Sequence, residues 1–220
     1  MPSSLLRLLH LASPALPIGG FHFSQGLEYA VEQGWVRDEA SAGEWIEGLA
    51  NCALGSLDLP VLARVFDACQ GRDFQAARRW NAFLIASRET AELRAEDLHM
   101  GAALAKVIAE HAVDVSTAAF DRPSYAAVFA FAGEQWGAER SDLLATYGWA
   151  WAENQTLAAI KLVPLGQNAG QRILHRLAEI LPGIVYRGAS LADEDIGVSA
   201  LMHSVASARH ETQYTRLFRS

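Results

Sequence analysis

A proline between two long apolar helical patterns constrains the fold of this chain more than any other feature. From Leu143 to Leu162, apolar residues recur at spacings near three, four and seven, which is the pattern of one helix face. Pro164 ends that helix, because its ring would clash with the carbonyl of Ile160 and it has no N–H to donate. The sequence therefore predicts two long helices that meet at a short polar break.

The second of these helices is predicted to begin at Asn168 and to end at Pro182-Gly183. Asn168 is a favourable N-cap, and Gln171 follows three residues later, where its side chain can complete a capping box. Pro182 removes a helical hydrogen bond, and a proline–glycine pair is typical of a helix end. The residues expected to be buried on this helix are Ile173, Leu174, Leu177, Ile180 and Leu181.

Polar side chains gather at the break between the two helices. They are Lys161, Gln167, Asn168, Gln171 and Arg172. Two interpretations stay open: the corner is a solvated end of a core helix pair, or it is a rigid polar platform for a partner or ligand. Lys161 is central to this choice, because it either faces a partner or pairs with Glu153 or Asp142 of its own chain.

The rest of the chain shows helical spacing and no convincing strand. The best strand candidate, residues 184–186, is too short to build a sheet. Asp58, with Pro60 two residues later, indicates a new helix, and a kinked continuation of the preceding helix is the alternative. Side chains suited to cap other helix starts are Asp38, Asp73 and Ser124.

Length and the absence of a linker predict the domain organisation. The chain has 220 residues, with no internal repeat and no stretch long enough to separate two domains. We therefore expect one compact all-α domain, residues 1–220, of about nine or ten helices with the proline-broken pair at its centre.

Charge argues against nucleic acid as the main partner. The formal net charge is −7, and no basic run is longer than Arg78-Arg79. Phosphate binding needs a basic face, which this composition does not indicate.

Cysteine usage and the apolar segments predict a cytoplasmic protein without a membrane span. Cys52 and Cys69 lie far apart among apolar neighbours, so both are expected to be buried thiols in a reducing compartment. Arg7 and His10 interrupt the N-terminal apolar run, which argues against a signal peptide. Residues 153–155 are polar and interrupt the longest apolar candidate for a membrane helix.

Motifs for catalysis, nucleotide binding and metal binding are absent from the sequence. There is no phosphate-binding loop, no nucleophile elbow and no HExxH zinc motif. His203 and His210 share a helix face but are separated by about 10 Å of helical rise, too far to bind one metal. His22 stands alone, and the acidic residues 193–195 are more typical of a solvated loop. We predict no catalytic residue, cofactor or metal ligand.

Two segments are apolar or aromatic where a core element is not expected. The loop from Ser13 to Phe23 contains two prolines and Gly19-Gly20, so it must pack on its own core or on another chain. Gly19-Gly20 is expected to let Ile18 and Phe21 lie on one surface. The tail, residues 212–220, interleaves basic and aromatic residues and is expected to dock a partner and not to be ordered alone.

The candidate partner-binding residues come from these two segments and from the polar break. They are Pro17, Ile18, Gly19, Gly20, Phe21, Gln25, Lys161, Gln167, Gln171, Gln213, Tyr214, Arg216, Leu217, Phe218 and Arg219.

Three segments carry a specific resemblance. SPALPIGGFHFSQGLE at 13–28, KLVPLGQNAGQR at 161–172 and RHETQYTRLFRS at 209–220 resemble the signature segments of the urease accessory protein UreF family. The resemblance spans nearly the whole chain and includes DLP at 58–60 and AWAENQ at 150–155. It departs at His22-Phe23, where a tyrosine–serine type of pair would also be expected.

The resemblance implies a dimerising, all-α cytosolic protein with no catalytic activity of its own. It implies a complex with the accessory protein UreD (UreH in some species), which recruits the GTPase UreG and helps to deliver nickel to apo-urease. It also implies that the protein either activates the GTPase or gates the coupling of GTP hydrolysis to nickel transfer. The alternative from another class is a helical enzyme whose site is assembled from distant residues such as Glu153, Lys161, His175 and Glu179. A third interpretation is a structural dimer with no regulatory role.

Overall fold

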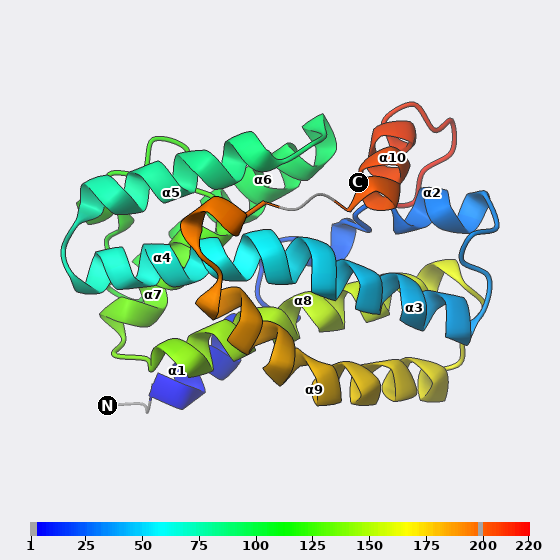
Figure 1. Cartoon of the computed structure of the whole chain (residues 1–220), viewed down its shortest axis with the longest axis horizontal. Coiled ribbons are helices and arrows are strands. Elements are labelled where there is room, and N and C mark those ends of the chain that lie inside the picture. Colours follow the sequence, from blue (N-terminus) through cyan, green and yellow to red (C-terminus); the bar gives the residue numbers. More distant parts are fainter. Residues whose placement is uncertain (1–3, 198–199) are drawn as a thin grey trace.

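All regular structure in the described part of the chain is helical. The computed structural model describes residues 4–197 and 200–220, and Figure 1 shows them as one helical domain without a sheet. The α-helices are α1 (Ser4–Leu11), α2 (Leu27–Glu32), α3 (Glu39–Leu49), α4 (Leu59–Gln70), α5 (Phe74–Ser87), α6 (Ala91–Ala109), α7 (Tyr125–Gln135), α8 (Arg140–Leu162), α9 (Gln167–Ser190) and α10 (Leu201–His210). The prediction of a single all-α domain is confirmed.

A continuous helical stretch crosses the middle of the molecule. A π-helical segment, Ala50–Asp58, joins α3 to α4, so the helix runs unbroken from Glu39 to Gln70 (Figure 1). The predicted new helix at Asp58 is therefore wrong, and the continuation alternative is correct. Asp58 does not cap a helix because its carboxylate is paired with Arg88.

This central stretch is also the one helix among the described residues that is long and apolar enough to cross a membrane. Most of its apolar part is buried inside the fold, as expected of a core helix. We therefore assign it to the core of the domain.

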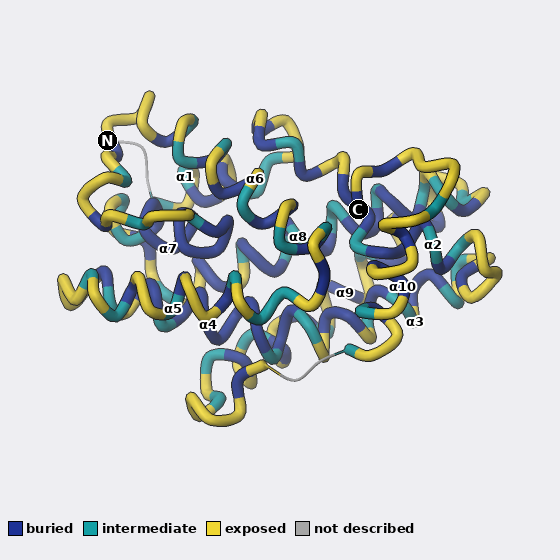
Figure 2. The backbone as a smooth tube through the Cα atoms, turned by 90° about the horizontal axis from the view of Figure 1, so that it is seen from above, coloured by how far each residue is buried: buried dark blue, intermediate teal, exposed yellow. Residues whose placement is uncertain are grey.

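The core is built around α4 and α7. Every residue of α7 from Tyr125 to Gly133 is buried, as expected of a helix that is apolar on all faces. Helix α7 packs against α4 on one side and α6 on another, and Figure 2 shows buried backbone inside an exposed outer layer. A Cβ atom on Gly101 of α6 would lie 2.1 Å from the carbonyl oxygen of Pro123, so glycine permits this close packing.

Three predicted helix starts are confirmed by their capping geometry. The side chains of Asp38, Asp73 and Ser124 accept hydrogen bonds from backbone N–H groups in the first turns of α3, α5 and α7. Asp38 also forms a capping box with Ser41. These local signals worked because the donor and the acceptor lie within three residues of each other.

The break at Pro164 is confirmed, but both predicted ends of α9 are wrong. Val163 is extended, as expected before a proline. Helix α9 begins at Gln167 with Gly166 as its N-cap, so Asn168 lies inside the first turn and is exposed. The helix continues through Pro182 to Ser190.

Packing explains why Pro182 does not end α9. The buried stripe of the helix continues beyond the proline at Ile184 and Gly188, while Pro182 itself faces solvent. A Cβ atom on Gly188 would lie 2.8 Å from the carbonyl oxygen of Gly55, so α9 remains in close contact with the central stretch there. These contacts offset the hydrogen bond that the proline removes.

The two cysteines differ in exposure. Cys69 is buried in α4, as predicted, whereas Cys52 is exposed on the π-helical segment, so that prediction is wrong. Apolar neighbours in sequence do not fix which face of a helix a side chain occupies.

Candidate partner-binding site

The structure brings the loop, the end of α8 and the tail together. The Nζ atom of Lys161 lies 5.6 Å from the ring centroid of Phe21 in the loop and 5.6 Å from that of Phe218 in the tail. An ammonium group at this distance from an aromatic face is attracted by the ring electrons. The loop and the tail therefore meet at the side chain of Lys161, although Phe21 lies 140 positions before it and Phe218 lies 57 positions after it.

The loop turns through a short 3₁₀ helix, Gly20–His22. Gly19 has φ 77°, a left-handed conformation that favours glycine. A Cβ atom on Gly20 would lie 2.9 Å from Asn154 Nδ2, so the loop backbone packs directly on α8. Ile18 is buried, whereas Phe21 is 45% exposed, so the expectation that they share one surface is wrong. The turn at Gly19 directs the two side chains to different environments.

Gln25 connects the loop to two helices. Its Nε2 donates a hydrogen bond to Glu96 Oε1 at 2.8 Å, and its Oε1 accepts one from Trp151 Nε1 at 3.0 Å. Its backbone has φ 52°, which is uncommon for a residue with a side chain. The half-buried Gln25 therefore fixes the loop to α6 and α8.

The tail is folded back onto the domain, so the expectation that it is not ordered alone is wrong. The backbone N–H groups of Leu217 and Phe218 donate to the buried Glu28 carboxylate at 2.6 and 2.8 Å. The N–H of Arg219 donates to the carbonyl oxygen of His22 at 2.8 Å. The N–H of Ser24 donates to the main-chain oxygen of Ser220 at 2.7 Å. Each of these bonds satisfies a polar backbone group of the tail.

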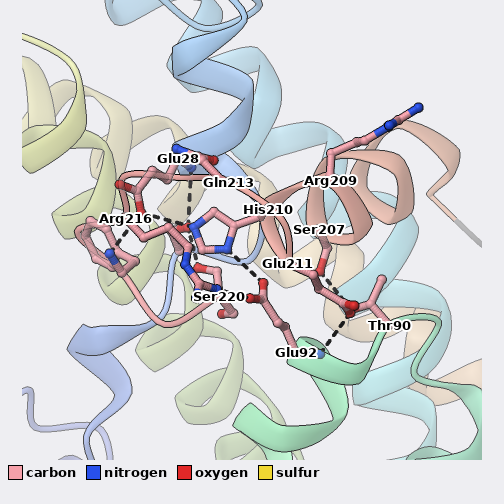
Figure 3. Close-up of polar contacts among 12 residues, drawn as sticks. Glu28, Thr90, Glu92, Ser207, Arg209, His210, Glu211, Gln213, Arg216 and Ser220 are labelled. Carbon is pink, nitrogen blue, oxygen red and sulfur yellow. Dashed lines mark hydrogen bonds and ion pairs between the residues drawn. The ribbon is translucent and has the colours of Figure 1, made fainter.

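A buried histidine stands between two carboxylates beneath the tail. His210 Nε2 lies 3.1 Å from Glu28 Oε2, and His210 Nδ1 lies 2.8 Å from Glu92 Oε2 (Figure 3). Each ring nitrogen is therefore at hydrogen-bond distance from a carboxylate oxygen. Glu92 also accepts a hydrogen bond from Arg216 at 2.9 Å. We call Glu28, Glu92 and His210 the tail clamp.

Glu96 contacts the end of the tail at the wall of a small pocket. Ser220 Oγ donates to Glu96 Oε2 at 3.0 Å, and both residues are buried. Burial raises the pKa of Glu96 to about 7 and lowers the pKa of His203, which lines the same pocket, to about 4. The pocket has a volume of about 50 Å³ and is lined by both polar and aromatic side chains.

A buried ion network lines the same pocket as Glu96. Arg88 Nε lies 3.0 Å from Asp97 Oδ2, and Arg88 Nη1 lies 3.1 Å from Asp58 Oδ2. Tyr147 donates to Asp58 at 3.2 Å, and the N–H of Tyr125 donates to Asp97 at 2.8 Å. Burial raises the pKa of the Asp97 carboxyl, and the Arg88 guanidinium opposes that shift. The network ties the central helix to α6, α7 and α8.

Exposed apolar and basic side chains remain above this framework. Tyr214 is fully exposed, Leu217 is 69% exposed, and Arg216 and Arg219 also face solvent. Phe218 is buried and so belongs to the interior of the chain. We call Phe21, Tyr214, Arg216, Leu217 and Arg219 the tail–loop surface.

The other candidate residues differ in position. Pro17 is exposed on the loop, and Gln213 is half-buried and donates to the carbonyl oxygen of Thr215 at 3.1 Å. Gln167 and Gln171 are exposed in the first turns of α9. Across residues 4–197 and 200–220, no hydrogen bond or ring contact joins Gln167 or Gln171 to the loop or the tail.

The alternative enzymatic site is not assembled. Lys161 faces the two phenylalanine rings, whereas His175 and Glu179 form an exposed pair on α9, 3.6 Å apart. Within the described residues, no ion pair joins Lys161 to Glu153 or Asp142, and no group of three or more His, Cys, Asp or Glu side chains is placed to hold a metal ion.

Sequence reasoning missed the tail clamp and Glu96. Glu28, Glu92 and Glu96 are acidic residues of a kind that is usually solvated, and His210 appeared only as a possible metal ligand. The usable signal was local: Glu92 and Glu96 lie four residues apart on the same face as the apolar Leu93 and Met100. Their partners, however, come from segments at least 71 positions away.

Replacing Lys161 by alanine should weaken the attachment of the loop and the tail. Each cation–π contact at an exposed site contributes about 0.5–1 kcal/mol, so the free energy of unfolding should fall by about 1 kcal/mol. Chemical unfolding of Lys161→Ala beside Lys106→Ala, which removes another exposed lysine, measures the difference. Equal stability of the two variants would show that the ring contacts contribute nothing.

Comparisons with known proteins give a consistent result. A family model described as UreF matches residues 36–178. The urease accessory protein UreF of Pseudomonas putida (strain W619) is 47% identical over 221 residues, covering 99% of this chain and 98% of that protein. The protein of the same name from Chromohalobacter salexigens is 46% identical over 220 residues, which cover 100% of this chain and 96% of that protein. That from Teredinibacter turnerae is 42% identical over the full length of both chains.

Proposed function

Because the chain belongs to the urease accessory protein UreF family, we propose that it is the non-catalytic adaptor of a urease maturation complex. In this role it bridges UreD, called UreH in some species, and the GTPase UreG, and it regulates GTP hydrolysis by UreG. The complex incorporates nickel, as cargo, into apo-urease. The chain acts as a homodimer in the cytoplasm. The relatives are named accessory proteins, which supports a role without catalysis of its own.

The tail–loop surface is the observation that carries this proposal. It presents the fully exposed Tyr214 and the mostly exposed Leu217 next to two arginines, on a chain whose net charge is −7. Aromatic residues and arginine are enriched at protein interfaces. We assign this surface to UreD, whose matching face should be apolar with acidic groups near the arginines.

The polar corner after Pro164 is assigned to the second partner. Gln167 and Gln171 are exposed at the start of α9, and among the described residues neither is hydrogen-bonded to the tail–loop surface. Amide side chains fixed on a helix can donate and accept hydrogen bonds across an interface. We propose that this corner contacts UreG while the tail–loop surface contacts UreD.

Loss of exposed tail side chains should weaken UreD binding strongly without unfolding the chain. Tyr214→Ala combined with Leu217→Ala removes two solvent-exposed anchors, and a loss of about 2 kcal/mol or more corresponds to at least about thirtyfold weaker binding. Tyr186→Ala is the matched control, because Tyr186 is 74% exposed on α9. Affinity is measured with purified UreD, and urease activity and nickel content are measured in cells.

The control and the double variant separate the possible outcomes. We expect Tyr186→Ala to bind UreD normally and to support urease activation. Normal UreD affinity in the Tyr214/Leu217 double variant, at an unchanged melting temperature, would exclude the tail–loop surface as the docking site. Turnover of a substrate by the purified chain alone would contradict the proposed adaptor role itself.

A further inference from the structure

We propose that the Glu96 side chain is a proton-controlled latch that holds the tail closed against the helical core, so that the tail loosens when this carboxyl group ionises. The inference concerns the tail itself and goes beyond the proposed function. It holds whether or not the tail–loop surface binds UreD.

Glu96 occupies the point where four segments meet. One carboxyl oxygen contacts Ser220 Oγ of the tail, and the other accepts from Gln25 of the loop, which in turn binds Trp151 of α8. Ser220 has no exposed surface and covers Glu96, which is 7% exposed on α6. Closing the tail therefore removes this carboxyl group from water.

The charges around Glu96 do not compensate for its ionisation. Its positive neighbour, Arg88, is already shared by Asp58 and Asp97 at hydrogen-bond distance. His203, from α10, lines the same pocket and is neutral near pH 7, because burial lowers its pKa to about 4. An ionised Glu96 adds a third carboxylate around one guanidinium group in a buried site.

The side chains that contact Glu96 from the loop and the tail are uncharged. Gln25 faces it from the loop and Ser220 from the tail. A protonated Glu96 can donate its hydrogen to Ser220 Oγ, since a serine hydroxyl both accepts and donates. The contact with the tail is therefore kept in the protonated form without the cost of burying a charge.

The direction of the pH effect follows from two states of Glu96. With the tail closed, burial raises the pKa of Glu96 from its ordinary 4.5 to about 7, while release of the tail returns the group to water. Between pH 4.5 and about pH 7, Glu96 loses its proton when the tail is released and keeps it when the tail is closed. Closure should therefore weaken by up to about tenfold per pH unit from about pH 5 to pH 7 and then level off.

Hydrogen exchange of the tail amides tests the latch on the full chain. The N–H groups of Leu217, Phe218 and Arg219 are hydrogen-bonded only while the tail is closed. Their protection factors, corrected for the intrinsic effect of pH, should fall by at least tenfold between pH 5.5 and 7.5. In Glu96→Gln, which copies the neutral carboxyl group, they should remain high and independent of pH.

The tail clamp, which also holds the tail, provides the matched variants. Glu92→Gln should lower tail protection at every pH but keep the pH dependence, since it leaves Glu96 intact. An unchanged pH dependence in Glu96→Gln, with its loss in His210→Gln, would assign the effect to the clamp and overturn the proposal. A native tail whose protection does not change with pH would also overturn it. Melting temperatures on the same samples separate tail release from global unfolding.

Discussion

Arg88→Met is expected to lower the free energy of unfolding by about 3–5 kcal/mol, the usual cost of leaving buried charges without their partner. Methionine replaces the apolar stem of arginine but has no guanidinium group, so Asp58 and Asp97 would remain buried without their cation. Urea unfolding at pH 7, followed by circular dichroism, measures the loss. The loss of stability should be smaller at lower pH, because burial raises the pKa of Asp97 and its carboxyl group then becomes protonated.

A matched surface variant shows whether burial causes this effect. Arg140 pairs with Asp67 at 2.9 Å near the surface, so Arg140→Met should cost less than about 1 kcal/mol. Adding Asp58→Asn and Asp97→Asn to Arg88→Met should recover part of the lost stability, since the uncompensated charges are then gone. If Arg88→Met were no less stable than Arg140→Met, the buried network would not hold the helices together.

Local rules predicted the fold wherever the partners lie close in sequence. Pro164 broke the long helix because a proline ring clashes within its own turn, whatever surrounds it. The same rule failed at Pro182, where contacts of α9 with the central helix outweigh one missing hydrogen bond. Asp58 has the sequence signature of a helix cap, but its carboxylate serves Arg88, 30 positions away.

In the candidate site, even more of the contacts join residues that lie far apart in the sequence, so local rules predict less of it. The apolar loop and the tail stood out in sequence because their side chains do not fit solvated segments. Their mutual contacts could not be predicted, since the bond between Phe218 and Glu28 spans 190 positions. The sequence also does not show that Ile18 and Phe218 point inward while Phe21 and Leu217 point outward. Such choices depend on the packed core, not on local propensity.

Removal of the clamp histidine should release the tail while leaving most of the core folded. His210→Ala would leave the buried Glu28 and the half-buried Glu92 without the ring that lies between them, a change that costs about 3–5 kcal/mol if the tail stays in place. The tail can avoid this cost by detaching, because detachment exposes both carboxylates to water. We therefore expect the Leu217 and Phe218 amides to lose at least about a hundredfold in protection from hydrogen exchange.

Protease digestion gives an independent measure of the same release. Trypsin should cleave after Arg216 and Arg219 faster in His210→Ala than in the native chain, because both residues become part of a free end. His175→Ala is the matched control, since His175 is exposed on α9 and pairs only with Glu179. Adding Glu28→Gln and Glu92→Gln to His210→Ala should restore part of the tail protection, because the like charges are then removed. If His210→Ala kept the native tail protection, the histidine would fill space beneath the tail without holding it, and the tail would depend on Glu28, Glu96 and Phe218 instead.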